Sequence, residues 1–182
     1  MASFDSAYIK IISGHEGGYV NDPTDRGGET YKGIARKRNP AWHGWSIIDR
    51  YNKNVSLMNA DPELQNEVLF FYKREYWDKV AGDHITDQDV ANELFDIAVN
   101  MGHNTAGKFV QHALNLLNKN AKLWNDIAED GIIGLGTLGI LNNAPPVAVL
   151  KCLNGQQFER YMELCESDPS QEKFLNGWLT RI

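Results

Sequence analysis

One short stretch near the amino terminus interrupts a chain that otherwise has helical periodicity. Between residues 19 and 34 the composition changes to Gly, Asp, Asn, Pro and Thr with short apolar pairs. These residues favour turns and short strands over helices, so the stretch predicts a small irregular β-hairpin. The chain is therefore expected to have an α+β fold that is mainly α: a helical body with one small β-hairpin near the amino terminus.

Apolar residues at helical spacing predict helices on both sides of this hairpin. The first helix is expected to begin after Ser3, a favourable N-cap, and to end before Gly17 and Gly18. Asp61 and Pro62 are expected to open a second helix. Further helices are expected over residues 90–101, 106–117 and 137–141, from Pro146 to about Cys165, and around Phe174, Leu175 and Trp178.

The length and charge of the chain exclude several classes of protein. A chain of 182 residues can bury most of its apolar surface without disulfides, and a net charge of -6 gives no basis for nucleic-acid binding. No apolar run approaches the ~20 residues that cross a bilayer, and residues 1–10 lack the pattern of a cleavable secretory signal. We therefore expect a chain that is made in the cytoplasm and has no membrane span. The sequence does not determine its oligomeric state, and a monomer is favoured.

The two cysteines are expected to be free thiols. Cys152 and Cys165 lie thirteen residues apart in one predicted helix. At 1.5 Å of rise per residue this separates them by about 20 Å. A disulfide needs Cα atoms within roughly 7 Å, so the spacing does not allow one.

Three residues at and around the hairpin carry the groups that glycoside hydrolysis requires. Glu16 stands at the end of the first helix, Asp25 follows nine residues later, and Thr30 five residues after that. Glycosidases use one carboxylic acid to protonate the leaving oxygen, while a second group directs water or stabilises the charge on the sugar ring. We expect Glu16 to be the general acid, Asp25 the second carboxylate, and Thr30 the holder of water. A solvated Glu, a turn-forming Asp and an ordinary strand Thr are the alternatives.

The position of Glu16 suits a group that must keep its proton near neutral pH. A helix carboxyl end carries partial negative charge, which disfavours a carboxylate there. Burial against an aromatic ring such as Tyr19 or Trp77 would raise the pKa of Glu16 further above the ~4.3 of a free Glu.

Three further residues are predicted to contact a sugar. The rings of Tyr19 and Trp77 could stack on sugar faces, although an aromatic at helical spacing is more often a core residue. Asn100 precedes Gly102 at a helix end, where it could bind an acetamido group or simply cap the helix.

A metal site is not expected. His15 and Glu16 begin like the motif of a zinc protease, but Tyr19 occupies the position of the second His, which removes the paired ligands. Phosphate-binding glycine loops are also missing from the sequence, so no cofactor is predicted.

The run from Glu16 to Ile34, EGGYVNDPTDRGGETYKGI, closely resembles the signature of glycoside hydrolase family 108. Its members are N-acetylmuramidases with a lysozyme-like fold, found in phage endolysins and bacterial secretion activator proteins. The resemblance continues in three segments: Tyr72–Trp77, Phe95–Gly102, and Asp130–Gly134 with Thr137.

The resemblance implies cleavage of the β-1,4 bond between N-acetylmuramic acid and N-acetylglucosamine in peptidoglycan, with the catalytic Glu of the family at Glu16. It also implies a lysozyme-like catalytic region over residues 1–118 and a carboxy-terminal helical region over residues 119–182 that resembles a peptidoglycan-binding half, packed as one unit. A holin or a secretion route would bring the chain to the wall. Two alternatives remain: a non-catalytic module that binds peptidoglycan or a secretion apparatus, and a lytic transglycosylase, which also needs a single Glu.

Overall fold

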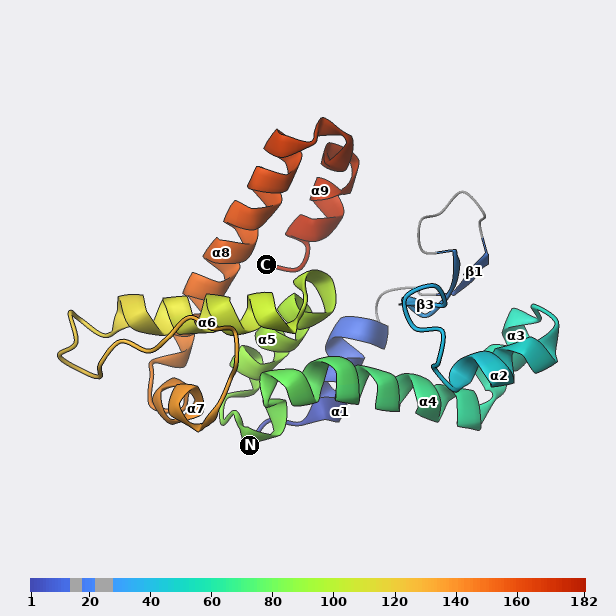
Figure 1. Cartoon of the computed structure of the whole chain (residues 1–182), viewed down its shortest axis with the longest axis horizontal. Helices are drawn as coiled ribbons and strands as arrows, with labels where there is room; N and C mark the ends of the chain where they lie inside the picture. Colours follow the sequence, from blue (N-terminus) through green and yellow to red (C-terminus); the bar gives the residue numbers. More distant parts are fainter. Residues whose placement is uncertain (14–17, 22–27) are drawn as a thin grey trace. The chain divides into compact units, whose positions relative to one another are not determined.

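A computed structural model describes residues 1–13, 18–21 and 28–182 of the chain (Figure 1). Glu16 and Asp25 lie outside these described residues. The chain divides into two compact units, one of residues Tyr8–Glu75 and one that joins Met1–Ala7 to Tyr76–Ile182. Helices make up most of the structure and a three-stranded sheet lies near the amino terminus, which confirms the α+β, mainly α fold.

The first helix consists of α1 (Phe4–Tyr8) and a π-helical turn, η1 (Ile9–Ser13). Ser3 begins it as predicted, because its Oγ accepts a hydrogen bond from the backbone N–H of Ser6 at 3.4 Å. The side chain thereby satisfies one of the N–H groups that the first turn of a helix leaves without a partner.

The sheet is antiparallel, with strands β1 (Tyr19–Asn21), β2 (Glu29–Tyr31) and β3 (Ile34–Ala35) in that order. Lys32 and Gly33 form the two-residue turn between β2 and β3, and both have positive φ, 44° and 78°. A turn with two left-handed residues matches the natural twist of a hairpin. Gly33 is required there, since a Cβ atom would lie 2.7 Å from the hydroxyl of Tyr72.

Four helical segments follow the sheet: α2 (Gly44–Ile48), η2 (Asp49–Tyr51), α3 (Val55–Ala60) and α4 (Pro62–Tyr72). Asp61 caps α4 as predicted, accepting from the N–H of Leu64 at 3.0 Å. The sequence did not predict α2 and α3, because helices of five and six residues are too short to show a repeating apolar stripe. The largest fully buried side chains of this unit are Tyr31, Ile34, Ile47, Ile48, Met58 and Leu64.

The other unit is built around α5 (Gln88–Met101), which packs against α6 (His103–Leu117) and α8 (Pro146–Ser167). A short helix, α7 (Leu135–Leu141), packs against α6, and α9 (Glu172–Leu179) lies beside α8 (Figure 1). These five helices confirm the segments expected from the sequence. The helices described here include none that is both long and apolar enough to cross a bilayer.

Short helical turns complete the two units. The π-helical turn η3 (Lys73–Trp77) continues α4, and η4 (Asp78–Val80) and η5 (Gly82–His84) lead to α5. A last turn, η6 (Pro169–Gln171), connects α8 to α9.

Both cysteines lie on α8 and both are free, as their spacing predicted. Cys165 is buried and Cys152 is half-buried. The helix holds them too far apart to form a disulfide with each other.

Candidate active site

Thr30 lies in the middle of the small sheet. It pairs with Val20 of β1 and with Ala35 of β3, so these three side chains point to the same face of the sheet. The side chain of Thr30 is half-buried, and its hydroxyl donates a hydrogen bond to the carbonyl oxygen of Gly28 at 3.3 Å. The hydroxyl proton is therefore committed to the backbone, and the hydroxyl oxygen can still accept a hydrogen bond.

Tyr19 points to the opposite face of the same sheet, where it pairs with Tyr31. Its hydroxyl donates to Oε1 of Glu29 at 2.7 Å. Burial raises the pKa of Tyr19, and the hydrogen bond to Glu29 adds to the rise. Tyr19 and Thr30 thus lie on adjacent strands, but their side chains face apart.

A chain of charged groups extends from Tyr19 and ties the sheet to the α2–η2 segment. Glu29 forms an ion pair with Arg36 at 2.8 Å, and Arg36 forms a second one with Asp49 at 2.5 Å. The guanidinium of Arg36 also lies 4.6 Å from the ring centroid of Trp45, a favourable cation–π distance. Because Tyr19 precedes and Glu29 follows residues 22–27, these contacts fix the strands on both sides of the segment that contains Asp25.

Sequence reasoning missed Glu29, Arg36 and Asp49. Glu29 lies in β2, Arg36 follows β3 and Asp49 lies in η2, so no single helix face or strand relates the three residues. Only the turn between β2 and β3 brings Glu29 and Arg36 together.

Trp77 is a core residue, which corrects its prediction as a sugar-stacking side chain. Its side chain is fully buried in a cluster with the rings of Phe4 and Phe95, whose centroids each lie 5.8 Å from that of Trp77. The indole N–H donates to Oδ1 of Asp83 at 2.7 Å. A ring enclosed in this way offers no face to a sugar, and its helical spacing reflected packing.

Asn100 is exposed in the last turn of α5, but it does not cap the helix. The C-cap position belongs to Gly102, which has a φ of 91°. Asn100 instead donates from Nδ2 to the hydroxyl of Tyr161 on α8, at 2.7 Å.

The described candidates therefore fall into two groups. Tyr19 and Thr30 belong to the sheet of the unit formed by residues 8–75, and Trp77 and Asn100 belong to the other unit. The remaining two predicted catalytic residues, Glu16 and Asp25, lie outside the described residues.

Comparison with known families identifies the class of protein. Residues 9–102, just over half of the chain, match the family described as "Glycosyl hydrolase 108". The chain belongs to glycosyl hydrolase family 108. The matched region of this family 108 chain contains the whole run from Glu16 to Ile34 and also includes Asn100.

The remaining part of the family 108 chain matches a second family. Residues 105–182 match the family described as "Predicted Peptidoglycan domain". Together the two matches support a hydrolase that acts on peptidoglycan.

A solved structure supports the fold. The structure of Brucella abortus SagA is similar at 25% sequence identity and a TM-score of 0.63, over 98% of this chain and 88% of that one. Among curated proteins none matches the chain.

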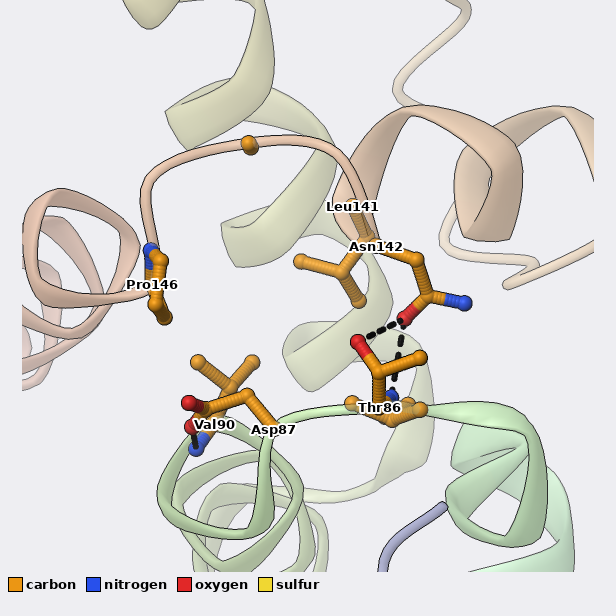
Figure 2. A pocket seen from close by; sticks show the side chains of 8 residues that line it. Thr86, Asp87, Val90, Leu141, Asn142 and Pro146 are labelled. Carbon is orange, nitrogen blue, oxygen red and sulfur yellow. Dashed lines mark hydrogen bonds between the residues drawn. The ribbon is translucent and has the colours of Figure 1, made fainter.

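A pocket of about 170 Å³ lies between the start of α5 and the connection from α7 to α8 (Figure 2). Val90 and Leu141 point into it from opposite sides. Its polar groups bond to one another: Asn142 accepts from the N–H of Thr86 at 2.9 Å, and Asp87 accepts from the N–H of Val90 at 3.0 Å. The predicted site residues do not line it, so the pocket is not the candidate active site of this family 108 chain.

Within the described part of the family 108 chain, His, Cys, Asp and Glu side chains do not gather in groups of three that could hold a metal ion.

Proposed function

We propose that this chain is an N-acetylmuramidase that hydrolyses the β-1,4 bond between N-acetylmuramic acid and N-acetylglucosamine in peptidoglycan. The family 108 match over residues 9–102 carries the proposal, because it contains the run with Glu16, Asp25 and Thr30 at their expected spacing. The peptidoglycan domain match over residues 105–182 supports the same polymer as substrate.

Each of these three residues has a defined role in the proposed reaction. Glu16 is the general acid that protonates the leaving glycosidic oxygen, and Asp25 is the second carboxylate. Thr30 holds the attacking water. Its hydroxyl donates to Gly28 and can therefore accept a proton of that water, which leaves a water lone pair free to attack the sugar.

The carboxy-terminal region is proposed to hold the wall while the amino-terminal region cuts it. The division at residues 118 and 119 that the sequence suggested remains our proposal for the border between these two tasks. A holin or a secretion apparatus is the proposed route by which the chain reaches peptidoglycan.

Mass spectrometry of the soluble fragments released from purified peptidoglycan tests the proposal. We expect the wild-type chain to release fragments with reducing N-acetylmuramic acid ends, and Glu16→Gln to release fewer by at least about 100-fold, the lower limit of what general acid catalysis contributes. Glu63→Gln is the matched control, since Glu63 is an exposed side chain of α4 and the chemical change is the same. The control is expected to release fragments at the wild-type rate.

The other possible outcomes would overturn the assignment of the acid or indicate a different function. Full release by Glu16→Gln would overturn the assignment of the acid. Anhydro-sugar ends, one water lighter, would indicate a lytic transglycosylase. Retention of the wild-type chain on insoluble wall with no released ends would indicate a binding module.

A further inference from the structure

Four polar side chains form a continuous hydrogen-bonded chain between α5 and α8. Glu93 accepts a hydrogen bond from Nε2 of Gln157. Oε1 of Gln157 accepts from the hydroxyl of Tyr161 at 2.9 Å, and that hydroxyl accepts from Nδ2 of Asn100 at 2.7 Å. Glu93 and Asn100 are seven residues apart, on one side of α5.

The chemistry of the first member fixes the direction of every bond in this chain. A carboxylate only accepts hydrogen bonds, so the carboxylate of Glu93 requires Gln157 to present its amide nitrogen. The amide oxygen of Gln157 then faces Tyr161, whose hydroxyl must donate to it. The phenol oxygen can consequently only accept from Asn100, which requires Asn100 to turn its nitrogen inward.

The two middle members of this hydrogen-bonded chain are shielded from solvent. Gln157 is fully buried and Tyr161 is 1% exposed. The ring of Tyr161 stacks on Trp178 of α9, with centroids 5.2 Å apart. Burial raises the pKa of Tyr161 to about 12, with a further contribution from nearby Asp96, so the hydroxyl keeps the proton that the chain needs.

This order leaves Asn100 with one fixed orientation at the protein surface. The nitrogen of its amide is engaged, and Oδ1 is the atom left to face outward from an exposed residue. Among the described residues, no hydrogen bond to Oδ1 of Asn100 is formed. A carbonyl oxygen held in this way can accept a hydrogen bond without a cost in side-chain entropy.

We propose that Asn100 is a specificity residue that accepts a hydrogen bond from the acetamido N–H of an N-acetylated glycan, and that Glu93 is the positioning residue that sets its direction. The identity of the ligand, an N-acetylated glycan, rests on the proposed function as an N-acetylmuramidase. Its distinctive consequence is that Glu93 affects binding through Gln157 and Tyr161, at about 10 Å along α5 from the residue that makes the contact.

A double-mutant cycle with Glu93→Gln and Asn100→Ala tests the proposal. A Gln at position 93 can donate as well as accept, so the chain loses its fixed direction and the amide of Asn100 can turn over. Kd is measured by titration calorimetry with a hexamer of β-1,4-linked N-acetylglucosamine, and KM and kcat with soluble glycan strands from purified peptidoglycan.

The loss of one hydrogen bond is expected to raise Kd and KM about tenfold in Asn100→Ala, with kcat within a factor of two. Glu93→Gln is expected to raise both constants about two- to fivefold, because only part of the molecules retain the competent orientation. In the Asn100→Ala background, Glu93→Gln is expected to have no further effect. Tyr161→Phe, which breaks the chain in its middle, should reproduce the effect of Glu93→Gln.

Glu159→Gln is the matched control, since it makes the same change at an exposed position of α8 outside the chain. It is expected to leave Kd, KM and kcat unchanged. Urea unfolding of every variant identifies effects that arise from stability alone.

Two results with the variants would overturn the proposal: a wild-type Kd in Asn100→Ala, or an effect of Glu93→Gln that is equally large in the Asn100→Ala background. Failure of the proposed function has a different signature, since the wild-type chain would then release no fragments from peptidoglycan. The calorimetric cycle can be read in either case, and absence of hexamer binding by the wild-type chain would also overturn the proposal.

Discussion

At the scale of the residue, what a polar group can do depends on where its proton already points. The hydroxyl of Thr30 is committed to a backbone oxygen and that of Tyr19 to Glu29. The oxygen of Thr30 can still accept a hydrogen bond, whereas that of Tyr19 already accepts from Nδ2 of Asn21 at 3.4 Å. The two side chains also face opposite sides of the sheet. The face with Thr30 is the one that suits the proposed chemistry, and Tyr19 instead secures the strands beside residues 22–27.

Replacement of Trp77 tests its assignment to the core. Trp77→Phe removes the hydrogen bond to Asp83 and leaves a cavity beside Phe4 and Phe95, so we expect a loss of about 2–4 kcal/mol in the free energy of unfolding. Urea unfolding measures this loss, and the KM for peptidoglycan should not change. A raised KM with wild-type stability would instead restore a contact with sugar.

Single residues were predictable where a local rule decides their role. Ser3 and Asp61 cap helices as their chemistry requires, because a cap depends only on the next three residues. Trp77 was ambiguous, since core packing and sugar stacking require the same aromatic residue. The ion pairs of Arg36 form because residues of different elements meet in the fold. Their spacing in the sequence does not indicate that they will be neighbours.

At the scale of the element, α5 combines two kinds of contact. Val90, Leu94 and Ile97 are at most 2% exposed and belong to the apolar core. Another side of the helix carries Glu93 and Asp96, which meet polar partners from α8 and from the end of the chain. The apolar stripe made the helix predictable, but the polar side could not be interpreted until its partners were placed.

The ion pair between Asp96 and Arg181 should hold the carboxy-terminal end on α5. The side chains are 8% and 18% exposed, so Arg181→Met leaves a largely buried carboxylate without this cation. We expect a loss of about 3 kcal/mol in the free energy of unfolding. Urea unfolding at an unchanged m-value measures it.

Neutralising the carboxylate should recover part of that loss. Adding Asp96→Asn to Arg181→Met removes the buried charge, so the double variant is expected to be more stable than Arg181→Met alone. A double variant that is no more stable than Arg181→Met would show that the unpaired carboxylate is not the cause of the loss.

At the scale of the whole molecule, the border between the matched families does not coincide with the border between the compact units. The family matches meet between residues 102 and 105, whereas residues 76–182 belong to one unit. Consequently α5 lies in the glycosyl hydrolase match but packs on α6 and α8 of the peptidoglycan domain match.

A fragment of residues 1–102 is therefore expected not to fold cooperatively. It would expose the buried side chains of α5, and each large apolar side chain contributes about 1.5–3 kcal/mol when buried. Thermal unfolding followed by circular dichroism tests this, with the full chain as the reference. A sharp transition in the fragment would show that the first family region is an independent folding unit.

The same packing has a consequence for engineering. If the region that matches the peptidoglycan domain were exchanged at a junction at residues 102–105, α5 would pack against a foreign partner. The chain passes from one compact unit to the other twice, after Ala7 and after Glu75, so residues 8–75 are topologically an insert within the other unit. A chimera that preserves the packing would replace residues 8–75 as a whole. It would keep residues 1–7 together with residues 76–182, because Phe4 packs on Trp77 and on Phe95 of α5.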